Sequence, residues 1–256
     1  MSIGAPIGSA IGSAIGSGMA GGGAAPAFDP ITLYSGGKKG FWIKPRDWTT
    51  LFQNSGGTGA VTVATDPVGW YTDLSGNGLT MEQATGTARG LAATQGGYAC
   101  VDYDGVDDGA STAVFTPGKL TASMDCYVAL YRDTAANMMP AYGSGGEYFA
   151  VMESGSGASA SAGAGASVTY RVNGVAVPGG TSTTRGQIHT ATPTGAWLVL
   201  SVQSLNLSAW LKFLIANYSS FSWNGKFAEI ILCESVDATA RAQIETYLGA
   251  QVGLTL

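Results

Sequence analysis

Three carboxylates stand close together at Asp104, Asp107 and Asp108, and they are the residues whose spacing could hold a metal ion. Calcium binds through several carboxylate and carbonyl oxygens, so this cluster is a candidate calcium site. The same residues also fit a tight turn, because an aspartate followed by glycine accepts hydrogen bonds from the backbone just after it. We expect a turn at Asp104-Gly105 with calcium as the alternative, and no other metal or cofactor.

A carboxylate pair suited to glycoside hydrolysis is missing from the sequence. That reaction needs one protonated and one ionised carboxyl group flanking the bond to be cleaved. Glu229 and Glu234 are five residues apart and would face opposite sides of a regular strand. The single histidine, His189, lies in a threonine-rich stretch without a nucleophile-elbow motif. The sequence therefore predicts a protein that is not an enzyme.

Aromatic side chains beside polar loops could stack on sugar rings. The glycan-binding candidates are Trp70 and Tyr71, which precede the polar stretch that begins at Asp73, and Tyr142 and Tyr148, which flank a glycine-rich loop. Aromatic rings also pack well inside a protein, so the alternative is that these residues belong to the core or to sheet packing.

The charge content limits the partners of this chain. The 256 residues include 12 Lys and Arg against 17 Asp and Glu, and only 11% of the chain is charged. So few cations cannot neutralise many phosphates, which argues against nucleic-acid binding. Cys100, Cys126 and Cys233 each lie in an apolar run, which predicts buried free thiols in a protein folded in a reducing cytosol rather than disulfides.

Residues 1–28 carry no charged side chain and form a repetitive arm. Large apolar residues recur in it at every fourth position: Ile3, Ile7, Ile11, Ile15 and Met19. A glycine-rich segment does not offset its own ordering entropy, so these side chains indicate burial against other chains. We expect an arm that anchors and oligomerises the protein, as a strand or a supercoiled helix; a floppy leader is the alternative. The arm lacks the basic start of a signal peptide and is too rich in Gly and Ser for a typical membrane span, although its small-residue spacing also occurs in packed membrane helices.

The rest of the chain, residues 29–256, predicts one β-rich domain. Short apolar runs alternate with Gly, Asn, Asp and Pro, which is typical of strands joined by turns. The expected strands are Phe41–Ile43, Ala60–Ala64, Tyr98–Tyr103, Cys126–Tyr131, Tyr148–Met152, Val168–Val172, Val175–Val177, Ala196–Val202, Ala209–Ile215 and Lys226–Cys233. Asn173-Gly174 predicts a hairpin turn, and Ser154–Ser167 predicts a solvated low-complexity loop with nothing to pack. A helix over Ala238–Ala250, capped by Asp237, closes the domain.

Four segments resemble one family of proteins. They are DPVG at 66–69 with DLSGNG at 73–78, VDYDGVDD at 101–108, and NGKFAEIIL at 224–232 followed by the closing helix. In this order they resemble the laminin-G-like, concanavalin A-like domains of structural proteins in tailed bacteriophages, over about residues 41–256. The family often carries W-x-D-P-S-D near its start, where this chain has the more basic Trp42–Asp47.

The resemblance implies a concanavalin A-like (laminin G-like) jelly-roll β-sandwich with one C-terminal helix and an extended N-terminal arm. It implies a non-enzymatic virion protein, assembled in the host bacterial cytoplasm. We expect a tail-fibre or tail-tip component whose lectin-like domain attaches to a host receptor or surface glycan. A capsid decoration protein or head fibre is the alternative, and a glycan-degrading enzyme a remote one. The expected partners are other virion proteins bound through the arm and further copies of the chain, without nucleic acid or a membrane span.

Overall fold

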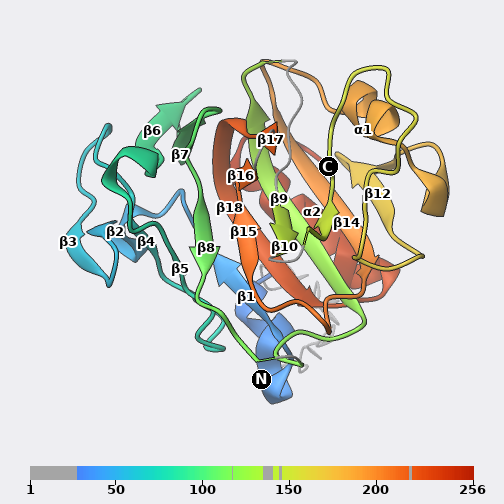
Figure 1. Ribbon diagram of the computed structural model, residues 1–256, viewed down its shortest axis with the longest axis horizontal. Coiled ribbons are helices and arrows are strands. Elements are labelled where there is room, and N and C mark those ends of the chain that lie inside the picture. Colours follow the sequence, from blue (N-terminus) through green and yellow to red (C-terminus); the bar gives the residue numbers. More distant parts are fainter. Residues whose placement is uncertain (1–27, 117, 135–140, 144–145, 219–220) are drawn as a thin grey trace, which may run out of the picture.

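The computed structural model describes residues 28–256 apart from positions 117, 135–140, 144–145 and 219–220. These residues form two large antiparallel sheets, one short ribbon and few helices (Figure 1). The expected all-β architecture of two sheets is therefore confirmed. The predicted arm residues Ile3, Ile7, Ile11, Ile15 and Met19 lie outside the described residues.

The first sheet, called the main sheet below, contains the longest strands. Its order is β13-β12-β14-β9-β18-β7-β6. Strand β7 pairs with the first half of β18, and β1 pairs with the second half of the same strand. The strands are β1 (Gly40–Ile43), β6 (Leu91–Gln95), β7 (Tyr98–Asp104), β9 (Met124–Arg132), β12 (Thr169–Val172), β13 (Val175–Ala176), β14 (Trp197–Leu205) and β18 (Asn224–Glu234).

The second sheet is built from much shorter strands in the order β11-β10-β15-β8-β5-β4-β2-β3. Their bounds are β2 (Leu51–Asn54), β3 (Thr58–Ala60), β4 (Trp70–Tyr71), β5 (Met81–Glu82), β8 (Ala110–Thr112), β10 (Ala141–Gly143), β11 (Tyr148–Phe149) and β15 (Phe213–Ile215). A separate ribbon pairs β16 (Asn217–Tyr218) with β17 (Phe221–Ser222).

The helical elements lie between and beside these strands. The α-helices are α1 (Arg185–Ala191) and α2 (Ala238–Gln251), and the 3-10 helices are η1 (Pro30–Gly37), η2 (Trp48–Thr50), η3 (Gly86–Ala88) and η4 (Gly180–Ser182). Helix α2 begins after Asp237, whose Oδ1 accepts a hydrogen bond from the Ala240 amide at 2.8 Å. This carboxylate satisfies one of the amides that a helix start leaves unpaired.

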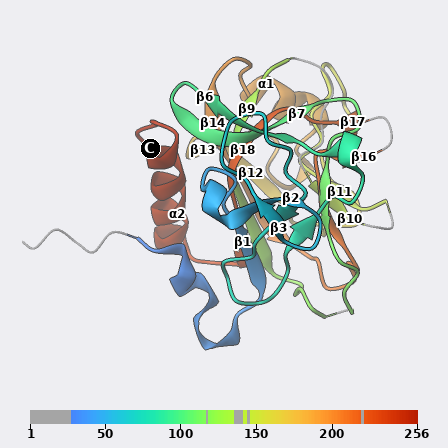
Figure 2. The same cartoon turned by 90° about the vertical axis from the view of Figure 1, so that its left-hand side faces the viewer.

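The main sheet is buried on both faces. One face packs on the second sheet, where the Phe41 and Phe213 rings meet edge to face with centroids 4.9 Å apart. The other face is covered by α2 and η1, and there Ile231 packs with Ile244 and Leu248 (Figure 2). Strands buried on both faces lack polar alternation, which explains the near-continuous apolar runs in β9, β14 and β18.

Most predicted strands of the main sheet are present, whereas several predicted strands elsewhere are shorter than expected. The strand expected at Ala60–Ala64 ends at Ala60, the one at Ala209–Ile215 begins at Phe213, and the one at Tyr148–Met152 covers two residues. Helix α1 was not predicted. The three cysteines are free and buried, as predicted.

The Asn173-Gly174 hairpin is confirmed, and the solvated loop is wrong in part. Asn173 and Gly174 both have positive φ, at 49° and 76°, between the paired residues of β12 and β13. Within the Ser154–Ser167 loop, Ala160 and Ala164 are fully buried in the core between the sheets. These two alanine methyl groups pack on the core, while most other residues of the loop are exposed to solvent, as predicted.

A substitution at Gly40 tests the pairing of β1 with β18. Its φ is 130°, and a Cβ added there would overlap the Leu232 carbonyl oxygen. We expect Gly40→Ala to lower the free energy of unfolding by about 3 kcal/mol or more, measured by urea denaturation. Gly97→Ala is the matched control, because Gly97 also has positive φ but open space around its Cβ position, and it should cost about 1 kcal/mol. Equal losses in the two variants would contradict the described pairing.

Candidate functional site

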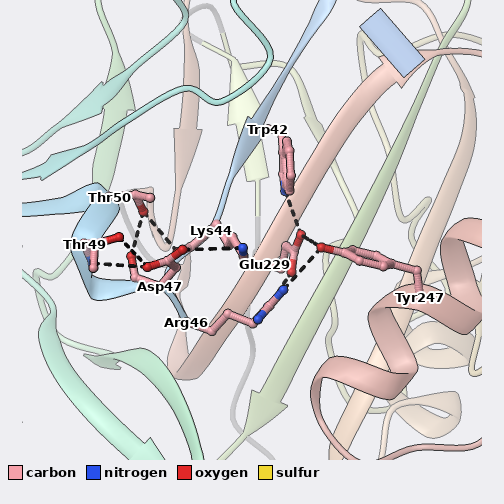
Figure 3. A network of polar contacts seen from close by, with 8 residues as sticks. All are labelled: Trp42, Lys44, Arg46, Asp47, Thr49, Thr50, Glu229 and Tyr247. Carbon is pink, nitrogen blue, oxygen red and sulfur yellow. Dashed lines mark hydrogen bonds and ion pairs between the residues drawn. The ribbon is translucent and has the colours of Figure 1, made fainter. Parts of the chain in front are cut away.

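A polar network beneath α2 surrounds the carboxylate of Glu229, which is fully buried in β18. A register shift between Phe227 and Glu229 interrupts the pairing of β18 with β9 just before this residue. Glu229 Oε1 accepts hydrogen bonds from Trp42 Nε1 at 2.6 Å and from the Tyr247 hydroxyl at 2.9 Å. Glu229 Oε2 accepts from Arg46 Nε at 2.7 Å (Figure 3). Donors from β1, the following loop and α2 therefore meet on one anion.

The electrostatics of this network are self-consistent. Burial alone would lower the pKa of Arg46, but the adjacent Glu229 carboxylate holds that pKa above its ordinary value. Burial, and then Glu229, raises the pKa of the Tyr247 hydroxyl, which stays protonated and donates its hydrogen bond. A buried carboxylate with a cation and two further donors is a stable anchor. Both of its oxygens accept hydrogen bonds from the protein and neither is exposed to solvent, which disfavours a role in proton transfer.

The basic residues of the Trp42–Asp47 segment are used inside the protein. Arg46 pairs with Glu229, while Lys44 forms an ion pair of 3.4 Å with Asp47 and lies 5.7 Å from the centroid of the Trp42 ring. Asp47 caps η2 through the Thr49 amide. The Trp42–Asp47 segment therefore holds β1 and the loop after it against β18.

Two further buried carboxylates, Glu245 and Asp125, hold α2 and the residues just before it against the main sheet. Glu245 Oε1, from α2, accepts hydrogen bonds from Ser201 Oγ at 2.8 Å and from Arg171 Nε at 3.2 Å. Asp125, in β9, accepts from the Ser235 hydroxyl and the Val236 amide, just before α2 begins. Glu245 and Asp125 were not singled out from the sequence, and Glu229 was considered there only as half of a carboxylate pair for glycoside hydrolysis. A carboxylate inside an apolar strand such as FAEIIL is nevertheless a readable signal of an internal partner.

The outer face of α2 borders a groove of about 780 Å³. Its lining residues are all uncharged: Phe28, Ala238, Thr239, Ala242, Gln243, Thr246, Tyr247, Ala250 and Gln251. The Phe28 ring meets the Tyr247 ring edge to face, with centroids 5.7 Å apart. Tyr247 thus joins the groove to the Glu229 network, and the first described residue of the chain lies in the groove.

A second hollow of about 500 Å³ lies beside α1 and is lined by backbone, hydroxyl and amide groups. Its residues are Gly155, Ser156, Gly157, Pro178, Thr184, Gly186, Gln187, Thr190 and Ala191. Next to it in sequence, Arg185 donates hydrogen bonds of 2.8 Å to Glu153 Oε2 and to the Tyr148 hydroxyl. The hollow offers hydrogen-bonding groups without an aromatic platform of its own.

The structure places the four predicted glycan-binding residues as two pairs: Tyr142 is paired with Tyr148 across β10 and β11, and Trp70 and Tyr71 are neighbours in β4. Tyr71 is fully buried and its hydroxyl lies 2.7 Å from that of Tyr103, so the prediction that it stacks on a sugar is wrong. Tyr148 is partly buried, and the Arg185 guanidinium lies 5.2 Å from the centroid of its ring. Trp70 is partly buried in β4. Tyr142 lies in β10, and its side chain is outside the described residues.

The turn at Asp104-Gly105 is confirmed. Asp104 Oδ1 accepts a hydrogen bond from the Val106 amide at 2.7 Å, and Asp108 Oδ2 accepts from the Asp104 amide at 3.0 Å. One carboxylate oxygen from each of Asp104, Asp107 and Asp108 lies within 4.8 Å of the others. These three residues could hold a cation such as calcium, and calcium binding there stays a prediction.

The polar stretch that begins at Asp73 also forms the expected turn, and it does more than close a loop. Asp73 Oδ1 accepts from the Ser75 amide at 2.9 Å and from the Trp42 amide at 3.0 Å. Asn77 donates to the carbonyls of Lys38 and Gly40. The turn therefore holds the free edge of β1, the strand that carries Trp42.

The remaining chemical candidate, His189, lies in α1, and its carbonyl accepts a hydrogen bond from Arg132 Nη1 at 3.1 Å. No known protein family, curated protein or solved structure matches this chain. Across the described residues, none of the helices is both long and apolar enough to span a bilayer.

The Glu229 network yields a test of its energetic role. Glu229→Gln leaves the guanidinium of Arg46 without its counter-charge, and we expect a loss of about 2–4 kcal/mol in the free energy of unfolding. The more exposed pair serves as control, since Lys44→Met should cost about 1 kcal/mol or less. Urea denaturation measures both. The double variant Glu229→Gln with Arg46→Met should lose less stability than the two single variants lose in sum. A loss equal to that sum would contradict direct coupling of the two side chains.

Asp108 yields a pH-dependent prediction. Burial, helped by Asp104, Asp107 and Asp102, raises the pKa of Asp108 to about 6. The folded state therefore favours the protonated acid, and this stabilisation is present near pH 4 and lost as the pH rises through about 6. We expect Asp108→Asn to raise the stability at pH 7.5 by about 1 kcal/mol, with a smaller effect at pH 4. Unfolding curves at both pH values measure this, and a larger gain at pH 4 would contradict it.

Proposed function

We propose that this protein is a non-enzymatic structural component of a tailed bacteriophage virion. In this proposal residues 29–256 form a concanavalin A-like (laminin G-like) jelly-roll domain that residues 1–28 tether to the particle. The four motif segments of the sequence support the family, and the two antiparallel sheets with a helix at residues 238–251 agree with such a domain.

The observation that carries the proposal is the position of Phe28. This residue packs on Tyr247 of α2, on the helix-covered face of the main sheet. The second sheet packs against the opposite face (Figure 2). The arm therefore joins the domain on the side that α2 covers. The second sheet lies on the opposite side and is free to face away from the particle. Such polarity suits a domain displayed on a tether.

Within the virion we favour a tail fibre or tail tip, where the domain attaches to a host surface glycan. The hollow beside α1 supports this choice, because Ser156, Thr184, Gln187 and Thr190 line it with hydroxyl and amide side chains, the groups that hydrogen-bond to sugar hydroxyls. Thr184 and Gln187 also cap the start of α1, so only their remaining hydrogen-bonding capacity is available to a ligand in the hollow. A capsid decoration protein or head fibre is the second candidate, since it needs the same tether. Copies of the chain associate through the arm in either setting.

Deleting residues 2–25 tests the tether. The described residues all lie outside the deletion, so we expect the truncated protein still to unfold cooperatively while its incorporation into particles is lost. Quantitative blotting of purified virions against free protein measures this. Incorporation at the level of the full chain would overturn the tether, and loss of folding would show that residues 2–25 belong to the domain.

The same particles show where the protein lies. Val114 is 73% exposed and the three native cysteines are buried, so Val114→Cys provides one reactive thiol for a gold label. Label at the tail tip supports attachment, and regularly spaced label on the head supports the decoration protein. Absence of label from particles that carry every other virion protein would overturn the virion proposal.

A further inference from the structure

The outer face of α2 is unusual for the exposed side of a helix. Surface helices normally present charged residues to solvent opposite their apolar face. Here the exposed residues beside the groove are Ala238, Thr239, Ala242, Gln243, Thr246 and Ala250, and none is charged. Glu245, an acidic residue of the helix, points to the main sheet and bonds to Ser201 and Arg171. The groove therefore suits an occupant that is uncharged and partly apolar.

The chain itself supplies a segment of this chemistry. Residues 1–28 carry no charge, and their large apolar residues recur at every fourth position from Ile3 to Met19. In a helical arm these residues would be about 6 Å apart, and Ala238, Ala242, Thr246 and Ala250 have the same spacing along α2. Small side chains at this interval on a helix leave a shallow channel in which larger apolar side chains can pack.

The connection between the arm and the groove is short and direct. Phe28, which lines the groove, is the residue where the described part of the chain begins. The segment from Ala20 to Ala27 separates it from Met19 and reaches at most about 29 Å when extended. Helix α2, with 14 residues, is about 21 Å long, and the segment Ile3–Met19 would span about 26 Å as a helix, so a helical arm can return along α2. A tether this short gives an effective concentration on the order of millimolar.

We propose that the segment Ile3–Met19 binds the α2 groove of its own chain. Binding buries the isoleucines against the helix in the free protein and continues the contact that Phe28 already makes with Tyr247. The inference concerns the free chain and does not depend on whether the arm tethers the protein to a particle. An arm stored in this way stays covered after synthesis and is available for exchange onto another surface.

Spin labelling of the full chain tests the proposal. A nitroxide on Thr255→Cys should abolish the methyl signals of Ile3, Ile7, Ile11 and Ile15 in a sample with ¹³C-labelled isoleucine methyl groups. Thr255 is exposed and does not line the groove, but it lies beside it, because the carbonyl of the next residue, Leu256, accepts a hydrogen bond from the groove residue Thr246. The same label on Val63→Cys, an exposed site that follows β3 in the second sheet, is the control and should leave them visible. The buried native cysteines do not compete for the label. Arm methyl signals that stay visible with both labels would overturn the proposal.

A mixed sample separates binding within one chain from exchange between chains. Spin-labelled chains without ¹³C are mixed with ¹³C-labelled chains that carry no nitroxide, and we expect the arm signals to remain. Loss of these signals in the mixture would place the arm on a second copy and overturn binding within one chain. Ala242→Glu, which puts a charge into the groove, should increase the amide hydrogen exchange of residues 3–19, whereas Val63→Glu should not. Unchanged exchange in Ala242→Glu would also contradict the proposal, and neither result bears on the incorporation of the deleted variant into particles.

Discussion

A carboxylate buried inside a sheet is the constraint on which the rest of this structure depends. Glu229 has no access to water, so every hydrogen bond that water would supply must come from the protein. Trp42, Arg46 and Tyr247 supply them from three separate elements. The positions of β1, the loop after it and α2 are thus set by one charge. Because Phe28 packs on Tyr247, this network also lies next to the point where the N-terminal arm joins the domain.

The same arrangement recurs over the face of the main sheet that α2 covers. Glu245 ties α2 to β12 and β14, and Asp125 ties the start of the helix to β9. A buried ion pair adds little net stability compared with apolar packing, but an unpaired charge is very costly. The carboxylates therefore select one placement of α2 among many that hydrophobic contacts alone would allow. Since their oxygens are already engaged, they are poorly suited to acid–base catalysis.

The sequence predicted the main sheet well because long runs buried on both faces are distinctive. It predicted the second sheet poorly, since strands of two or three residues such as β4 and β5 carry almost no periodic signal. Helix α1 was missed although Thr184 and Gln187 form a capping box, which is a readable start signal. For the site, Tyr71 could not be told from an exposed tyrosine, because its burial depends on Tyr103 from a distant strand. Glu229 was weighed with Glu234 as a catalytic pair and set aside, whereas its apolar flanks indicated an internal anchor.

The ion pairs within the chain explain how its few charged residues are used. Several of the few cations are committed inside the protein: Arg46 to Glu229, Arg171 to Glu245, and Lys226 to Asp102 and Asp133. The exposed face of α2 and the arm carry no charge at all. Association through such surfaces relies on apolar packing and neutral hydrogen bonds, which salt screens little. In this protein the charges of these residues hold the uncharged face of α2 in place rather than being displayed on it.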